Sequence, residues 1–209
     1  MLEQYRTVYE GGEGEITEKK SRFIATVHPV ESEEEALAFL EEMKKKYWDA
    51  RHNCYVYSIG MNREFTRCSD DGEPSGTAGR PMLDVILGEE IYNVAVVVTR
   101  YFGGVLLGTG GLVRAYAKGA KMALDAAGTA TFVPYTAFTT QVDYAGYEKV
   151  MHELAKYGVV CDGTEFAAEV TLKLRAKEEN FARFKSFLAD YTSGRSICTV
   201  IGSAFGKED

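Results

Sequence analysis

Residues 93–111 of this 209-residue chain read NVAVVVTRYFGGVLLGTGG, and an alanine-rich run then continues to Gly128. A continuous apolar run followed by clustered glycines and a helical pattern predicts a buried strand, a tight loop and a helix N-terminus. We expect the strand at about 93–101 and the helix from about Gly110 to Ala127, ended by Gly128. This strand–loop–helix unit is the centre of the predicted fold.

The same stretch differs in charge from the rest of the chain. The formal net charge is −7, yet residues 91–124 contain no acidic residue and four basic ones. Free N–H groups and the helix dipole make a helix N-terminus attractive to anions. We therefore predict a local anion- or phosphate-binding surface formed by Arg100, Gly103, Gly104, Gly108, Thr109, Gly110, Gly111, Arg114 and Lys118.

Basic and apolar residues of the predicted helix fall on adjacent sides. Arg114, Lys118 and Lys121 recur at i, i+4 and i+7, which places them along one side. An adjacent apolar stripe is expected to face the core, and it comprises Val113, Ala117, Ala120 and Leu124. An alternative is that the glycines serve packing alone and the lysines lie on a solvated face. The loop matches neither a Walker loop nor a dinucleotide fingerprint.

A second candidate is the turn-rich segment 68–81, which reads CSDDGEPSGTAGRP. Three carboxylates within four residues have the chemistry to hold Mg²⁺ together with substrate phosphates. Two alternatives stay open: an exposed turn that bonds its own backbone, or a lock in which Arg80 or Arg100 pairs with these carboxylates. The residues singled out in this loop are Asp70, Asp71, Glu73, Ser75, Thr77 and Arg80.

The patterns along the chain indicate two domains, 1–134 and 135–209. In the first, Ser32 and Glu35 form a capping box before a helix from Glu33 to about Tyr47. In the second, the order strand–helix–strand–strand–helix–strand predicts a ferredoxin-like fold. Strands are expected at 15–29, 52–60, 136–144, 159–166, 168–175 and 197–205, and further helices at 147–157 and 178–191.

The sequence assigns no catalytic residue, no metal site and no cofactor, because its four cysteines lack C-x-x-C spacing and its three histidines lie far apart. His52 and Cys54 have no orienting third group, and we expect structural roles for both. The first residues lack the apolar core of a signal peptide, and the apolar run at 94–98 is too short to span a bilayer. We expect a cytoplasmic protein with no membrane partner.

Several long motifs occur together in the first domain. They read KSRFIA at 20–25, RHNCY at 51–55, SDDGEPSGTAGRP at 69–81, TRYFGG at 99–104 and GTGGL at 108–112. These motifs closely resemble the YigZ/IMPACT family, and residues 135–209 resemble the smaller C-terminal domain of its bacterial two-domain members. The resemblance implies an α+β protein: a ribosomal-protein domain 2-like N-terminal domain, as in elongation factor G domain IV, and a ferredoxin-like C-terminal domain, as in its domain V.

The resemblance also implies a link to translation, since eukaryotic relatives act in translational control by binding an activator of a stress-response kinase. We rank first a translation-linked protein whose basic surface meets RNA, the ribosome or a translation-associated protein. Second is a phosphate- or nucleotide-binding enzyme, by analogy with the GHMP kinases that share the implied fold, with Mg²⁺ held by Asp70, Asp71 or Glu73. Third is a protein–protein adaptor.

Overall fold

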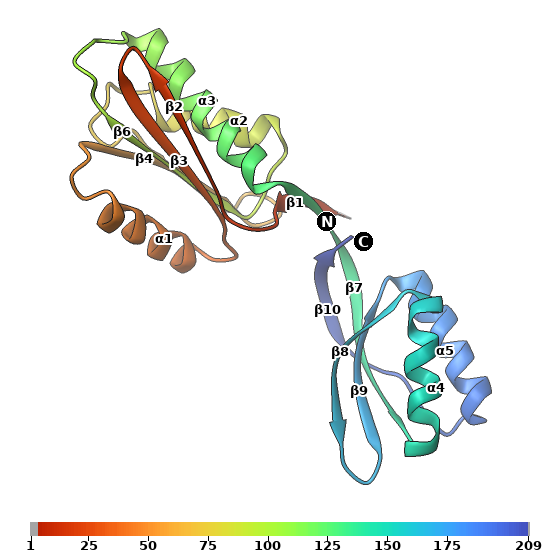
Figure 1. Ribbon diagram of the computed structural model, residues 1–209. Coiled ribbons are helices and arrows are strands. Elements are labelled where there is room, and N and C mark those ends of the chain that lie inside the picture. The colour runs from red at the N-terminus through yellow and green to blue at the C-terminus, as the bar shows by residue number, and fades with distance from the viewer. Residues whose placement is uncertain (1–3, 209) are drawn as a thin grey trace. The chain divides into compact units, whose positions relative to one another are not determined.

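The structure is a computed structural model that describes residues 4–208. The chain divides into two compact units, Met1–Thr131 and Phe132–Asp209, each a mixed α+β arrangement with its own core (Figure 1). The division falls inside strand β7, Thr129–Val142, close to the expected boundary at 134/135. None of the described helices combines the length and the apolar character needed to cross a membrane.

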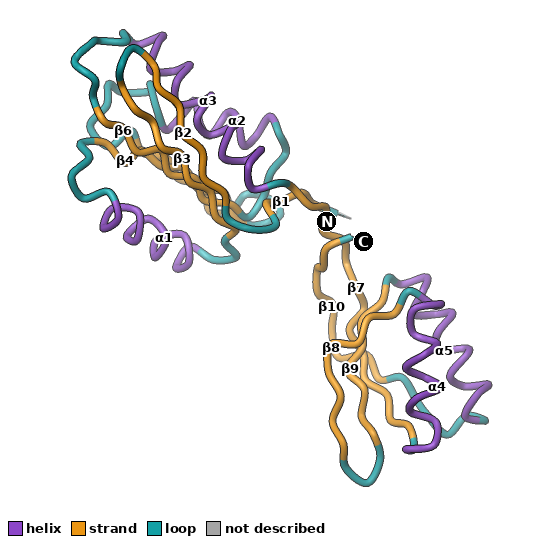
Figure 2. Tube along the Cα trace, in the orientation of Figure 1, coloured by secondary structure: helices purple, strands orange, loops and turns teal. Residues whose placement is uncertain are grey.

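The N-terminal unit is built on a five-stranded antiparallel sheet with the order β2-β3-β6-β4-β5. Helix α1 covers one face of this sheet, and α2 and α3 cover the other, as Figures 1 and 2 show. The elements are β1 Tyr5–Val8, which pairs with β7, then β2 Gly12–Glu18, β3 Ser21–Pro29, α1 Glu33–Lys46, β4 His52–Ile59, β5 Phe65–Ser69, α2 Gly79–Gly88, β6 Val94–Tyr101 and α3 Thr109–Ala127.

The central strand β6 confirms the predicted buried strand. Val96 and Val98 pack toward α2 and α3, whereas Ala95 and Val97 pack toward α1. Helices therefore bury both faces of the strand, which explains a continuous apolar run in place of an alternating one.

The predicted caps of the two long helices are confirmed. The Ser32 hydroxyl accepts from the Glu35 backbone N–H at 3.2 Å, and the Glu35 carboxylate accepts from the Glu31 N–H at 2.7 Å. Helix α3 begins at Thr109 and ends at Gly128, which has a φ of 67°. These local signals fixed the helix bounds to within a residue or two.

The predicted core stripe of α3 is partly wrong. Val113 is 36% exposed, because the side of the helix that packs against the sheet carries its neighbour Leu112 instead. Ala120 and Leu124 are buried as expected. The residues that α3 buries are Leu112, Ala115, Tyr116, Gly119, Ala120, Ala123 and Leu124.

The stretch expected to form a strand at 15–29 is a hairpin of β2 and β3. Its turn is made by Lys19 and Lys20, with φ of 45° and 67°. A two-residue hairpin turn with positive φ at both positions normally carries Asn and Gly. Because Lys19 and Lys20 are not typical residues of such a turn, the sequence does not indicate that the strand is interrupted here.

The C-terminal unit has the predicted order β-α-β-β-α-β, with an antiparallel sheet in the order β10-β7-β9-β8. Helices α4 and α5 lie on one face of it (Figure 1). Cys161 lies on the edge strand β8 and Cys198 precedes the opposite edge strand, and both thiols are free. The elements after β7 are α4 Tyr144–Leu154, a 3₁₀ turn Ala155–Tyr157, β8 Val159–Phe166, β9 Val170–Ala176, α5 Glu178–Thr192 and β10 Thr199–Lys207.

Candidate anion-binding site

Motifs far apart in the sequence meet at the end of the N-terminal sheet where β6 leads into the loop before α3. The Arg100 guanidinium donates from Nη1 to Glu73 Oε1 at 2.7 Å, and the two side chains are only 7% and 3% exposed. The Tyr116 hydroxyl donates to the same Oε1 at 2.8 Å, and Arg100 Nη2 donates to Ser21 Oγ at 3.2 Å. We call Ser21, Glu73, Arg100 and Tyr116 the buried ion-pair cluster.

This cluster joins the start of β3, the turn before α2, the end of β6 and α3. It corresponds to the interpretation in which an arginine pairs with the acidic turn and locks two loops together. Arg100 is therefore turned away from solvent, in contrast to the expectation that it meets an external phosphate. The physical reason is that a charge inside the core requires an opposite charge beside it, and Glu73 supplies that charge.

The Asp70 carboxylate organises the acidic turn through backbone donors. Oδ1 accepts from the N–H groups of Ala78 and Gly79 at 2.9 and 2.8 Å, and Oδ2 accepts from Gly76 N–H at 2.8 Å. Burial works to raise the pKa of Asp70, but these three donors together outweigh it and hold the pKa below its usual value. Asp70 thus links the turn to the first residues of α2.

The other members of the predicted motif loop have structural partners or point to solvent. The Asp71 carboxylate accepts from Asn53 N–H at 2.6 Å, and the Thr77 hydroxyl donates to the Pro74 carbonyl at 2.6 Å. Arg80 pairs with Asp84 on the helix surface at 2.8 Å. Ser75 is exposed at the outer side of the turn.

The acidic turn does not fit a divalent cation. Asp70 is saturated by backbone N–H groups, and Glu73 is bonded to Arg100 and Tyr116. Across residues 4–208, no group of three or more His, Cys, Asp and Glu side chains is placed to hold a metal ion. We therefore derive no chemistry through Mg²⁺ at this turn.

Cys54 and His52 have the structural roles expected of them. The Cys54 thiol is buried and donates to the Asp70 carbonyl at 3.0 Å. Burial, together with the nearby carboxylates, raises the pKa of this thiol to about 12, so it stays protonated and is not a nucleophile. His52 Nδ1 lies 2.9 Å from the Asp71 carbonyl oxygen and helps to fix the turn.

The N-terminus of α3, in contrast, is open. Gly108 precedes it with a φ of 76°, the first turn contains no acidic residue, and none of the described side chains caps it. The Gly111 and Leu112 N–H groups bond to the Gly108 carbonyl at 3.1 and 3.0 Å. In the described part of the chain, no acceptor is found for the N–H groups of Thr109 and Gly110. These two donors are available to an anion.

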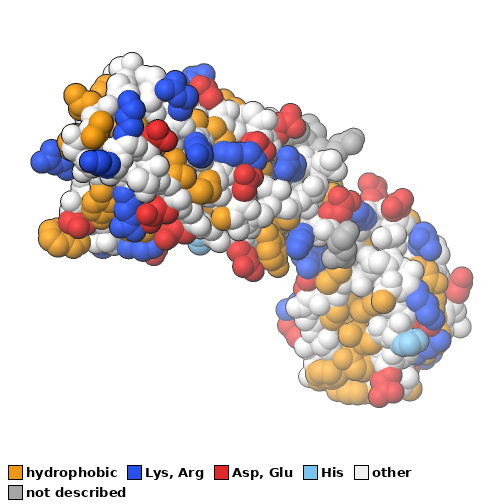
Figure 3. Space-filling model, turned by 45° about the horizontal axis from the view of Figure 1, so that its top comes forward, with side chains coloured by type: hydrophobic (Ala, Val, Ile, Leu, Met, Phe, Trp, Pro, Cys, Tyr) orange, Lys and Arg blue, Asp and Glu red, His pale blue; other side chains and the backbone are white. Residues whose placement is uncertain are grey.

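A cavity of about 220 Å³ lies between α3 and the β2–β3 turn. Its polar lining includes Lys19, Arg114 and Lys118 together with the carboxylate of Glu18. Lys20 is the other residue of the turn, and within residues 4–208 neither it nor the three lining cations forms an ion pair. We call Lys19, Lys20, Arg114 and Lys118 the basic surface. In Figure 3, basic and hydrophobic side chains are interspersed at this end of the N-terminal unit, on the left of the view.

Comparison with known proteins places this end within a described domain. Residues 19–124 match the Impact N-terminal domain, and residues 140–195 match a domain of unknown function, DUF1949. The chain is 39% identical over 196 residues to the IMPACT family member YvyE of Bacillus subtilis, an alignment that covers 94% of this chain and 90% of the relative. The chain belongs to the IMPACT family. The IMPACT family member YigZ of Escherichia coli is 38% identical over 185 residues, with 84% and 87% covered.

A solved structure resembles this chain over nearly its whole length. A crystal structure described as a hypothetical protein matches with a TM-score of 0.65 and 33% identity, over 97% of this chain and 99% of that one. The buried ion-pair cluster and the basic surface both lie inside the segment that matches the Impact N-terminal domain. The family match therefore includes every residue of the candidate site.

Sequence reasoning missed several residues that build the site. Lys19, Lys20 and Ser21 were not assigned to it, because two adjacent lysines give no turn signal comparable to Asn-Gly. Tyr116 was not singled out either, although its hydroxyl is the one polar side-chain group among the buried residues of α3. The buried Glu73 could not be told from its exposed neighbour Asp71 by spacing.

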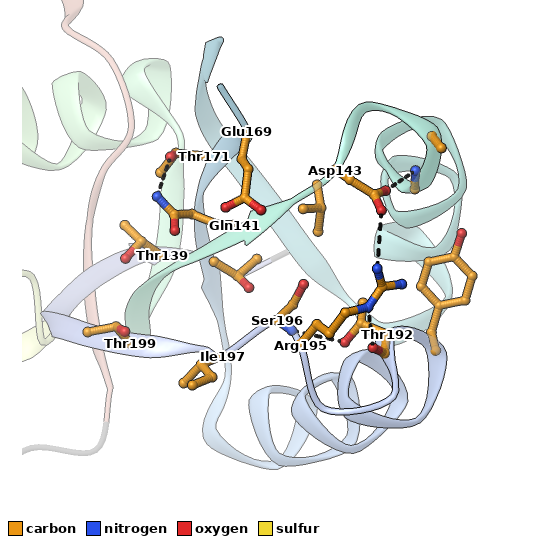
Figure 4. Close-up of a pocket in the computed structure, with 15 residues that line it drawn as sticks. Thr139, Gln141, Asp143, Glu169, Thr171, Thr192, Arg195, Ser196, Ile197 and Thr199 are labelled. Carbon is orange, nitrogen blue, oxygen red and sulfur yellow. Dashed lines mark hydrogen bonds and ion pairs between the residues drawn. The ribbon is translucent and has the colours of Figure 1, made fainter. Parts of the chain in front are cut away.

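A larger cavity, about 640 Å³, lies within the C-terminal unit at the end of β7, beside the start of α4 and the α5–β10 loop (Figure 4). Its lining is rich in hydroxyl groups, and its charged members are Asp143, Glu169 and Arg195. Asp143 caps α4 by accepting from Gly146 N–H at 2.7 Å and lies 3.8 Å from Arg195 Nη1. Two carboxylates and one guanidinium give this lining a formal charge of −1, so it lacks the excess of cations found beside α3.

Proposed function

We propose that this IMPACT family protein has a translation-linked regulatory role and binds RNA phosphates through the basic surface. One observation carries the proposal: four exposed cations that form no ion pair with any described residue gather beside a helix N-terminus that has no acidic residue and no side-chain cap from residues 4–208. Because the whole chain carries a charge of −7, such a gathering is a local feature of the molecule.

The geometry supports contacts to a phosphate of several kinds. The Thr109 and Gly110 N–H groups and the exposed Thr109 hydroxyl offer fixed donors at the helix start. The Arg114 guanidinium can bond two phosphate oxygens at once, whereas Lys19 and Lys118 act as point charges. Gly103, Gly104 and Gly108 shape the loop that presents these groups, and Gly111 lies in the first turn of α3.

The link to translation rests on the family resemblance and on the domain types that it implies. An N-terminal domain like domain IV of elongation factor G, followed by one like domain V, belongs to a molecule that meets the ribosome or its RNA in the cytoplasm. A translation-associated protein is the other partner class that we propose. The nucleotide-binding enzyme has less support, because the acidic turn that would hold Mg²⁺ is bonded internally.

The proposal is tested by RNA affinity measured at several salt concentrations. Replacing Arg114 and Lys118 by Gln should weaken binding and flatten the dependence of log K on log salt by about 1.4 for a single strand, roughly 0.7 for each lost contact. Lys45→Gln combined with Lys185→Gln is the matched control: this pair also removes two positive charges, from exposed positions of α1 and α5, and should leave the slope unchanged.

Two results would overturn this function. One is that no RNA binding is detected at low salt, where the phosphate contribution is greatest. The other is that the double variant binds with the affinity and the salt slope of the natural protein.

Melting temperatures of all variants should agree closely, since exposed residues without partners contribute little to stability.

A further inference from the structure

We infer that the basic surface selects single-stranded over double-stranded RNA, because the loop before α3 offers exposed apolar side chains on which unpaired bases can stack. The inference rests on the proposed function and names the class of RNA. It concerns residues 102–107, which lie between β6 and α3.

This loop exposes more apolar surface than a solvated connection requires. Phe102 is 48% exposed, Val105 is 39% exposed and Leu106 is 81% exposed, whereas Leu107 is buried and anchors the loop. We call Phe102, Val105 and Leu106 the apolar loop. Adjacent exposed apolar side chains within a charged surface are typical of a site that binds a partner.

The apolar loop is fixed against the cations of the basic surface. Gly103 N–H donates to Ser21 Oγ at 3.2 Å, and a Cβ added at Gly103 would overlap the Lys20 carbonyl. The backbone next to Phe102 therefore lies directly on the hairpin turn. At the other end of the loop, Leu107 lines the same cavity as Lys19 and Arg114. The hairpin turn that carries Lys19 and Lys20 thus contacts one end of the loop, and Arg114 shares a cavity with the other end.

Phe102 is held in a position suited to stacking. The Arg100 guanidinium lies 5.5 Å from the centroid of its ring, on the protein side, and Arg100 is itself fixed by Glu73. Phe102 nevertheless keeps about half of its surface, 48%, exposed to solvent. A ring already ordered before binding loses little conformational freedom when a base stacks on it.

Charge complementarity decides which partner fits. Cations that neutralise phosphates, combined with an exposed aromatic ring, are the two parts of single-strand recognition, in which bases stack and the backbone follows a positive groove. In a duplex the bases are stacked on one another, so the apolar loop gains no contact there. A duplex would use the cations alone.

The chain supplies a matched control for Phe102. Phe65 is also 48% exposed, but it pairs with Ile59 at the opposite end of the sheet, where Glu64 is its neighbour. Phe65→Ala removes the same side chain at the same exposure, away from the basic surface. A difference between the two variants therefore reports the position of the ring and not its general loss.

The experiment is a binding titration with a single-stranded RNA oligonucleotide and with the duplex of the same sequence. Phe102→Ala should lower single-strand affinity roughly 5- to 150-fold, the range expected for losing one stacked base. The salt slope and the duplex affinity should not change, because the cations remain. Leu106→Ala, at a still more exposed position, should show a smaller loss of the same kind, and Phe65→Ala should show none.

The outcomes separate this inference from the proposed function. Equal affinity for single strand and duplex, with no effect of Phe102→Ala or Leu106→Ala, overturns single-strand selection and leaves phosphate binding in place. No affinity for either RNA overturns both. If Phe102→Ala instead weakens binding to vesicles of phosphatidylserine and phosphatidylcholine, or to a protein captured in the presence of RNase, while RNA affinity is unaffected, the occupant of the apolar loop is not RNA.

Discussion

The buried ion-pair cluster and the basic surface lie at the same end of the N-terminal unit, yet they use arginine in opposite ways. Arg100 sits on a strand whose faces are both covered, so its guanidinium is bonded to Glu73 inside the core. Arg114 sits on α3 with its side chain in solvent and has no ion pair among the described residues. The comparison shows that the acid-free stretch contributes one arginine to the scaffold of the site and another to the charges presented to a ligand.

The largest effect is expected from breaking the cluster. Arg100→Leu would leave the Glu73 carboxylate buried without its counter-ion, and the free energy of unfolding should fall by about 3–5 kcal/mol. Urea denaturation followed by circular dichroism measures this loss.

A double variant tests the cause of that loss. Adding Glu73→Leu to Arg100→Leu removes the stranded charge, and a large part of the stability should return. If the single variant costs less than about 1 kcal/mol, in the range of an exposed pair, Arg100 is hydrated in solution and the division between cluster and surface does not hold.

A second, smaller effect tests how the cluster positions the surface. Gly103→Ala places a Cβ against the Lys20 carbonyl and the Ser21 nitrogen, so the turn and the loop must move apart. We expect a loss of about 1–3 kcal/mol, as for other overpacked sites, together with weaker RNA binding. Gly88→Ala is the control, since among the described residues its added Cβ meets nothing within 4 Å beyond its chain neighbours and its own helix backbone.

Stability and affinity should change together in this case. If Gly103→Ala destabilises the protein but binds RNA with unchanged affinity, the contact between the turn and the loop does not shape the basic surface. The two regions would then be neighbours without being coupled.

Much of the fold could be predicted from the sequence because its signals are local. The apolar run at 94–98, the capping pair Ser32 and Glu35, and the element order of the C-terminal unit all appear in the structure. Each depends on residues within a few positions of one another.

The candidate site was harder to predict because its contacts are long-range. Glu73 and Arg100 are 27 positions apart, and spacing does not show that they face each other. In a strand buried on both faces, alternation gives no signal for the direction of a single arginine. The prediction wrongly placed Val113 in the apolar stripe of α3. In the structure Tyr116 is buried on the sheet side instead, which is possible because its hydroxyl donates a hydrogen bond to Glu73.

A third effect concerns the acidic turn that supports the cluster. Asp70→Ala removes the acceptor of three backbone N–H groups and should cost about 1–2 kcal/mol near neutral pH, as for loss of a strong helix cap. The pKa of Asp70 is lowered on folding, so its contribution is present above the unfolded pKa and is lost as the pH falls through the folded value.

The pH profile distinguishes this cause from a general loss of packing. Stability of the natural protein should fall more steeply below about pH 4, near the unfolded pKa of Asp, than that of the variant. If the stability of the two proteins falls in parallel as the pH is lowered, the negative charge of Asp70 does not contribute to stability.

The smallest expected effect is a gain in stability that comes together with a loss of RNA affinity. Lys20 has a φ of 67°, a conformation that glycine adopts without strain, so Lys20→Gly should raise stability by about 0.5–1 kcal/mol. The same change removes one cation of the basic surface and should flatten the salt slope of RNA binding by about 0.7. Glu90→Gly, with a φ of 55° in the same unit, should stabilise similarly without weakening RNA binding. If Lys20→Gly stabilises the turn and leaves the salt slope unchanged, Lys20 does not contribute to RNA binding, and the basic surface does not extend to this position of the hairpin turn.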